Sequence, residues 1–175
     1  MSFGLEAFTL AHTVISLVGL ASGFVVMFGL LNAKRLDRWT AVFLATTLAT
    51  SVSGFGFPFE RLLPSHVVAI LSIVVLTLAI LARYTFHLAR TWRAVYVIGA
   101  VAALYFNVFV AIVQAFQKIP ALKAMAPTQS EPPFVAAQVL ALLLFVALAV
   151  AGVVRFHPDA ARIAGQRPVR RTLST

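Results

Sequence analysis

The sequence predicts an all-α, polytopic membrane protein with five transmembrane helices. Its residues are 61% hydrophobic and only 11% charged, whereas about 25% of the residues in a typical soluble domain are charged. Five apolar runs are close to, or longer than, the ~20 residues that a helix needs to cross a bilayer. A polar shell in water cannot cover such a composition, so we expect the chain to lie in a membrane.

The five runs cover residues 8–31, 39–57, 65–88, 94–117 and 134–155. The first lacks the basic start of a signal peptide, carries Glu6 instead, and is longer than a signal peptide's apolar segment, so we expect a retained anchor. The second begins at Trp39, the third follows Pro64, and the fourth begins just after Trp92. The last run follows a polar, proline-containing loop at 126–133. We expect this loop to cap the last helix or to offer a surface to a partner.

The basic residues divide unequally between the two ends of these runs. Of the 14 Lys and Arg residues, three lie on one side, Arg61, Lys118 and Lys123, and the other eleven lie on the opposite side or in the tail. By the positive-inside rule, the N-terminus is periplasmic and the C-terminus cytoplasmic in a bacterial inner membrane. The net charge of +9 therefore reflects topology, and we expect no nucleic-acid partner.

Residues 1–155 form one predicted transmembrane domain, and 156–175 form a basic cytoplasmic tail. Within the domain, Glu6 and Glu60 are 54 residues apart, as are His12 and His66, while Trp39 and Trp92 are 53 apart. These offsets predict two repeats, 6–57 and 60–117, arranged as a pseudo-two-fold four-helix bundle, with 134–155 as an extra helix. The alternative is a chance match, because apolar helices draw on few residue types.

Helical spacing predicts which polar residues face the protein interior, because lipid penalises exposed polar groups. His12, Ser16, Gly19 and Gly23 share one stripe of the first helix. The two glycines, four residues apart, permit close backbone approach. The other predicted interior positions are Thr47, Thr50, Ser51, Gly54, His66, Ile73, Thr77, Tyr84, Tyr96, Ala100, Ala103, Asn107, Gln114 and Gln138.

The two histidines suggest a cofactor site. In an up-down-up-down bundle the first and third helices are diagonal, so His12 and His66 would face each other at similar depth. This arrangement resembles the architecture of four-helix haem b membrane anchors, and the resemblance implies that both imidazoles bind one haem iron. The predicted cofactor-binding residues are His12, His66, Ser16, Gly19, Gly23, Asn107 and Gln114, with His12 and His66 as the metal ligands.

Two alternatives to haem remain open for these histidines. A copper or zinc ion would use them together with Glu6, Glu60 or Met125. With no cofactor, His12 and His66 would be interfacial residues hydrogen-bonded to loops. The sequence also places Arg83, His87 and Arg90 near the end of the third run, where snorkelling of basic side chains explains them.

The predicted function is that of a small membrane subunit that binds haem b near the outer surface and passes electrons between the quinone pool and a periplasmic partner. The alternatives are a non-catalytic assembly or structural subunit of a larger complex, or of a homo-oligomer, and a small-solute or lipid binder. The absence of cysteine excludes thiol catalysis and iron–sulfur clusters. The helix interiors carry no carboxylate relay of the kind that proton-coupled transporters use.

Overall fold

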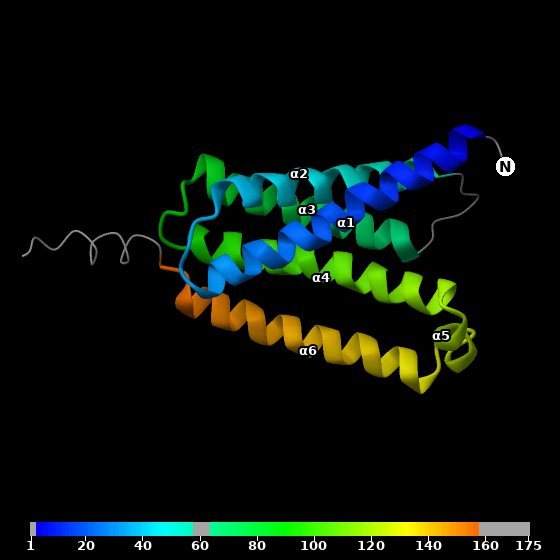
Figure 1. Cartoon of the computed structure of the whole chain (residues 1–175). Helices are drawn as coiled ribbons and strands as arrows, with labels where there is room; N and C mark the ends of the chain where they lie inside the picture. The colour runs from blue at the N-terminus through cyan, green and yellow to red at the C-terminus, as the bar shows by residue number, and fades with distance from the viewer. Residues whose placement is uncertain (1–2, 58–63, 158–175) are drawn as a thin grey trace, which may run out of the picture.

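The computed structural model describes residues 3–57 and 64–157, and these residues form helices and connecting turns without strands (Figure 1). The predicted all-α class is confirmed. The helices are α1 (Phe3–Leu31), α2 (Asp37–Ser53), α3 (Pro64–Ile80), α4 (Trp92–Lys118), α5 (Pro120–Met125) and α6 (Pro132–Arg155). A 3₁₀ turn, η1 (Gly54–Gly56), extends α2, and a π-helical turn, η2 (Leu81–Thr85), extends α3.

Among the described residues, four helices are long and apolar enough to cross a membrane: α1, α3 with η2, α4 and α6. A multi-pass membrane protein is therefore supported, with four candidate spans, and the predicted fifth span is not confirmed. The remaining run is helical, but α2 has only 17 residues. It also begins with Asp37 and Arg38 and carries several hydroxyl side chains. A crossing by this segment stays a prediction.

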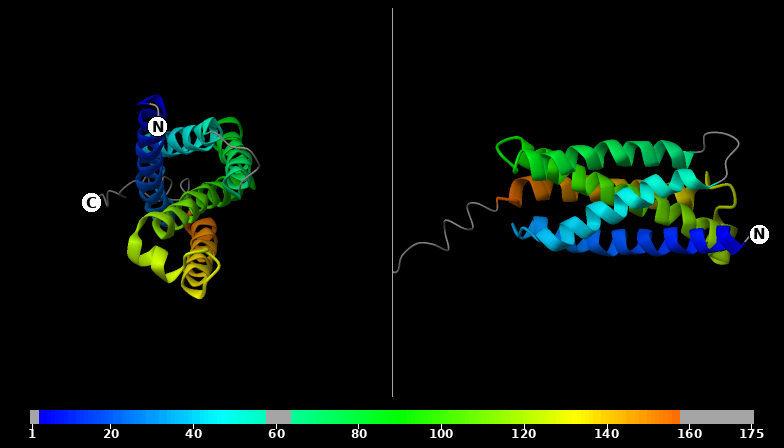
Figure 2. Two further views of the ribbon diagram at one scale, coloured as in Figure 1. Left: turned by 90° about the vertical axis from the view of Figure 1, so that its right-hand side faces the viewer. Right: turned by 90° about the horizontal axis from the view of Figure 1, so that it is seen from above.

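The helices run alternately in opposite directions between two ends of the molecule (Figure 1). We call the end that carries His12, His66 and α5 the histidine end. The opposite end, with Arg35, Arg83 and Arg93, is the arginine end. Seen from the histidine end, α1, α2, α3 and α4 form a four-sided outline, and α6 lies outside it beside α4 (Figure 2).

Helix α4 is central to the packing, because α1, α3, α5 and α6 all contact it. Helix α2 lies between α1 and α3 and contacts both. The buried apolar side chains gather toward the arginine end, where Met27, Phe43, Tyr96 and Val97 are among the core residues. The fold therefore consists of two adjoining helical hairpins, α1–α2 and α3–α4, with α6 packed against the second.

Glycines bring α4 close to its neighbours. A Cβ on Gly99 would lie 3.0 Å from the Ala79 Cβ on α3, and a Cβ on Gly152 of α6 would lie 2.9 Å from Val97. Small residues at helix contacts let backbones approach and gain dispersion energy where lipid offers no hydrophobic driving force. Close contact between helices is thus a general feature of this chain and is not confined to the predicted stripe of α1.

Three predicted interior positions are exposed: Thr77 and Tyr84 on the α3–η2 helix, and Gln114 on α4. The Thr77 hydroxyl donates to the Ile73 carbonyl one turn earlier, so it needs no partner from another helix. Gln114 shares a nominal face with Asn107, but α1 and α4 diverge toward the histidine end (Figure 1). The neighbour that covers this face at Asn107 is therefore absent at Gln114.

Candidate functional site

His12 is fixed by the end of α2. Its Nδ1 lies 2.8 Å from the Ser53 Oγ, and its ring packs edge-on against Phe57 at 5.1 Å between centroids. The Ser53 hydroxyl in turn lies 3.2 Å from the Thr50 carbonyl. A serine hydroxyl that holds one ring nitrogen sets the orientation of the imidazole, which is the role of outer-shell partners at metal sites.

His66 lies in the first turn of α3 and is buried, with 4% of its surface exposed. Its ring packs against Phe55 at 5.5 Å between centroids. Each histidine therefore contacts a different aromatic residue of the turn that follows α2. The structure places both at the histidine end, as predicted, with the Phe55–Phe57 turn in contact with each ring.

The small-residue stripe of α1 is occupied by neighbouring helices. A Cβ on Gly19 would lie 3.2 Å from the hydroxyls of both Thr46 and Thr47. At Gly23, a Cβ would lie 2.5 Å from Leu104 and 2.8 Å from the Phe43 ring. These two glycines were predicted to bind the cofactor, but the space beside them is filled by side chains of α2 and α4. The stripe is therefore a contact surface between α1 and its neighbouring helices.

The polar residues between the helices bond to one another. Ser16 donates to the His12 carbonyl at 2.7 Å and lies 3.4 Å from the Thr50 hydroxyl. The Asn107 amide donates to the Thr47 hydroxyl at 3.1 Å, joining α4 to α2. Ser51 donates to Ser72 at 3.1 Å, joining α2 to α3. These groups act as hydrogen-bonded links between helices.

The copper or zinc alternative finds no grouped His, Asp or Glu ligands in the described part of the chain. Among residues 3–57 and 64–157, no three His, Asp or Glu side chains are grouped so that they could hold a metal ion. Glu60 lies outside the described residues.

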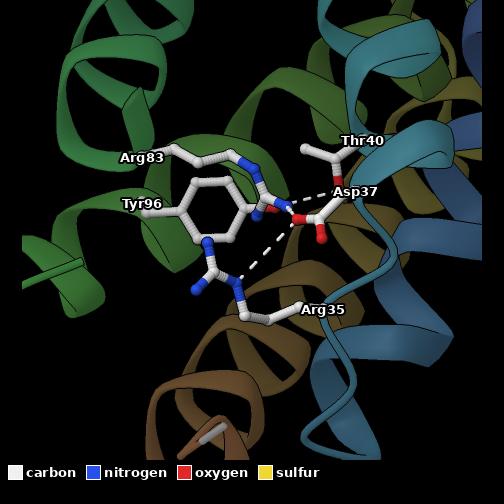
Figure 3. Close-up of polar contacts among 5 residues, drawn as sticks. All are labelled: Arg35, Asp37, Thr40, Arg83 and Tyr96. Carbon is white, nitrogen blue, oxygen red and sulfur yellow. Dashed lines mark hydrogen bonds and ion pairs between the residues drawn. The ribbon is translucent and has the colours of Figure 1, made fainter. Parts of the chain in front are cut away.

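A second polar cluster, at the arginine end, was not predicted (Figure 3). The Arg83 side chain is only 2% exposed, and its Nη2 donates to the Asp37 Oδ1. The Arg35 Nε lies 3.9 Å from the same oxygen. The Arg83 guanidinium also lies over the Tyr96 ring, 5.0 Å from its centroid, and the Tyr96 hydroxyl lies 3.4 Å from the Thr40 Oγ1.

Local structure explains how these side chains meet. Asp37 is the first residue of α2, where the helix dipole favours a carboxylate. Arg83 is the middle residue of η2, whose π-helical hydrogen bond runs from the Phe86 N–H to the Leu81 carbonyl at 2.9 Å. Snorkelling does not describe Arg83, because the guanidinium is buried against α4 and paired with Asp37. The one sequence feature that pointed to an ion pair here is Asp37, the single acidic residue inside a basic cluster.

The same end is tied to α6 by Arg93. Its Nη1 donates to the Phe156 carbonyl at 2.6 Å, and the buried Phe156 ring packs against Tyr96 at 5.9 Å. Basic side chains of this chain therefore bridge helices.

The connection between α4 and α6 is folded around Glu131. One carboxylate oxygen accepts the Thr128 N–H at 3.1 Å and the Thr128 hydroxyl at 2.9 Å, and the other accepts the Ser130 N–H at 3.1 Å. Desolvation raises the pKa of Glu131, but these hydrogen bonds outweigh it and hold the pKa below its ordinary value. The prediction that a loop side chain caps α6 is wrong, because no side chain of the described residues accepts a hydrogen bond from the first turn of that helix. Because α6 begins with Pro132 and Pro133, which lack N–H groups, the carboxylate binds back into the loop.

No protein family, curated protein or solved structure matches this chain.

Proposed function

We propose that the chain is a non-catalytic assembly or structural subunit of a larger membrane complex. The observation that carries this proposal is that the interior polar and small residues form contacts between helices. Ser16, Gly19, Asn107 and Thr47 serve contacts between helices. A close-packed interior whose polar groups bond to one another, with the buried Gln138 Oε1 as the exception, suits a scaffold that positions neighbours.

The proposed setting is a bacterial inner membrane, with the histidine end outside and the arginine end in the cytoplasm. The second predicted run would be a fifth span. Helix α2 has 17 residues and η1 has 3. Together they extend over about 30 Å, at ~1.5 Å per α-helical residue and ~2.0 Å per 3₁₀ residue. This length equals the ~30 Å hydrocarbon core of a bilayer.

The proposed contact surface for another subunit is the loop at the histidine end. Ile119 precedes α5 and Met125 is its last residue, and they are 48% and 56% exposed. Exposed apolar side chains beside an ordered polar loop are typical of a surface that a partner covers.

The test is the mass of the native complex. The tagged chain, extracted from its own membranes in mild detergent, should be recovered by native mass spectrometry with other polypeptides at fixed stoichiometry. Ile119→Ser with Met125→Ser should release them while the chain stays inserted, and Lys118→Gln should not. Recovery of the wild-type chain as a lone monomer would contradict the proposal.

A second candidate is the haem b subunit that passes electrons between the quinone pool and a periplasmic partner. The contact between His12 Nδ1 and Ser53 favours it, because it leaves the other ring nitrogen available to a metal. When bound, haem b would supply one-electron transfer. The filled glycine stripe weighs against this candidate.

An absorption spectrum of the protein purified with ample haem decides between the two candidates. The haem proposal expects a Soret band that His12→Ala and His66→Ala each remove and that His87→Ala leaves intact. A colourless wild-type protein would leave the structural subunit as the remaining proposal.

A further inference from the structure

The loop at the histidine end forms a half-open hollow of about 190 Å³ between the end of α4, α5 and the segment before α6. Its lining residues are Phe116, Gln117, Lys123, Pro127, Thr128 and Gln129. All lie within one stretch of chain, so the hollow does not depend on how the two hairpins pack. It lies apart from the histidines and from the Asp37–Arg83 pair.

The walls of this hollow are held in place from several sides. Gln129 adopts a left-handed backbone conformation with φ 60°, and its amide Nε2 donates to the Val113 carbonyl of α4 at 3.1 Å. Phe116 is buried and packs edge-on against Phe134 of α6 at 5.3 Å. The Glu131 carboxylate holds Thr128 from outside the hollow. A preformed wall lowers the entropy cost of binding a ligand.

Of the described residues that line the hollow, only one, a lysine, carries a charged side chain. Lys123 lines it and forms no ion pair within the described part of the chain. Glu131 lies nearby in sequence, but both its oxygens accept hydrogen bonds from Thr128 and Ser130. Each amide nitrogen of Gln117 and Gln129 uses one of its two hydrogens in a contact, which leaves one on each for another acceptor.

The lining also has an apolar side, formed by the Phe116 ring and Pro127. A lone phosphate would use the ammonium and amide donors and leave this side uncovered. A carboxylate on a short apolar body would use both. The volume is below the ~300 Å³ at which drug-sized ligand pockets begin, so the ligand is small.

We propose that this hollow is a binding site for a small organic anion, a carboxylate carried on a short apolar body. Lys123 and the two glutamine amides bind the carboxylate, and Phe116 with Pro127 packs against the apolar body. The hollow and the proposed partner surface lie in the same loop but use different residues, Lys123 with the two glutamines and Ile119 with Met125. Either proposal can therefore fail while the other holds.

The probe is para-fluorobenzoate, followed by fluorine NMR on the full chain in phosphatidylcholine nanodiscs, with empty nanodiscs as the reference for partitioning. Saturable binding is expected for the carboxylate and at least tenfold weaker binding for the neutral para-fluorobenzyl alcohol. Lys123→Gln should weaken carboxylate binding about tenfold, the factor that corresponds to loss of one charge-assisted hydrogen bond. Lys123→Arg should retain most of it.

Lys118→Gln is the matched control, because Lys118 is an exposed cation at the same end that does not line the hollow. Equal losses in Lys118→Gln and Lys123→Gln would reduce the effect to general charge and overturn the site. Equal binding of the acid and the alcohol would overturn the role of the anion. If inorganic phosphate displaces the probe as well as benzoate does, the apolar side plays no part, and the organic-anion proposal fails in favour of a bare-anion or headgroup site.

Discussion

Arg83 and Asp37 illustrate how unequal the two partners of an ion pair can be. The guanidinium is 2% exposed and the carboxylate 71% exposed. Removing the carboxylate leaves a cation buried against Tyr96, whereas removing the arginine leaves a carboxylate that water already solvates. The pair therefore depends more on Asp37 than its exposed position suggests.

We predict that Asp37→Asn lowers the free energy of unfolding by about 1–3 kcal/mol, the cost of leaving a buried charged group without its partner. Arg83→Met should cost less, because it removes the charge and keeps most of the apolar volume. Unfolding in mixed detergent micelles, followed by circular dichroism, measures both. A larger loss for Arg83→Met than for Asp37→Asn would contradict this assignment of the cost.

Glu131 gives the loop at the histidine end a predicted acid sensitivity. Its pKa in the folded protein is depressed, so its contribution to loop stability is present above the ordinary value of 4.5 and is lost as the pH falls through the folded-state pKa. The protection factors of the Thr128 and Ser130 amides against hydrogen exchange, which correct for the intrinsic pH dependence, should therefore fall in acid. In Glu131→Gln the protection should be low at every pH, without an acid transition.

At the scale of elements, helix positions were predictable because apolar runs in a membrane protein leave few alternatives. The runs 94–117 and 134–155 became α4 (Trp92–Lys118) and α6 (Pro132–Arg155), within two residues at each end. The third run was predicted to continue to 88, but η2 ends it at Thr85. His87 and Leu88 then adopt φ 49° and 61°. The sequence has no glycine or proline there that would predict this left-handed turn.

The candidate site was only partly predictable, since periodicity assigns faces and not neighbours. Spacing placed Ser16, Gly19 and Gly23 on one interior stripe of α1, and Gly19 and Gly23 are buried. What fills the space beside that stripe depends on α2 and α4, and the structure puts threonine and phenylalanine side chains there. The pairing of Arg83 with Asp37 spans 46 residues and depends on a π-helical turn, so no local pattern predicts it.

Close helix contact at Gly23 leads to a prediction for α1. A valine there would place carbon atoms into Leu104 and Phe43, both buried. We expect Gly23→Val to cost about 1–3 kcal/mol, as overpacking of a filled core does. Gly54→Ala is the control, because a Cβ at Gly54 has no atom within 4 Å. Thermal unfolding in detergent distinguishes the two, and equal stability of both variants would show that the interface yields without cost.

For the whole molecule, the asymmetry of charge and the alternating helix directions both bear on which helices cross the membrane and in which direction. Lys34, Arg35, Arg38, Arg90, Arg93 and Arg155 lie at the arginine end in addition to the paired Arg83, whereas Lys118 and Lys123 lie at the histidine end. Helix α2 returns the chain from the arginine end to the histidine end between α1 and α3 (Figure 1). If α1 and α3 span in the same direction, α2 must cross as well.

Cysteine labelling tests this topology directly, because the chain contains no cysteine of its own. Single cysteines at Gly56 and Ser130 should react with an impermeant maleimide on intact spheroplasts, and cysteines at Asn32 and His157 should react only after lysis. All four positions are exposed in the structure. Labelling of Gly56→Cys only after lysis, together with Asn32→Cys, would show that α2 does not cross. Labelling of His157→Cys on intact spheroplasts would reverse the orientation, and with it the proposal that the histidine end and its hollow face the periplasm.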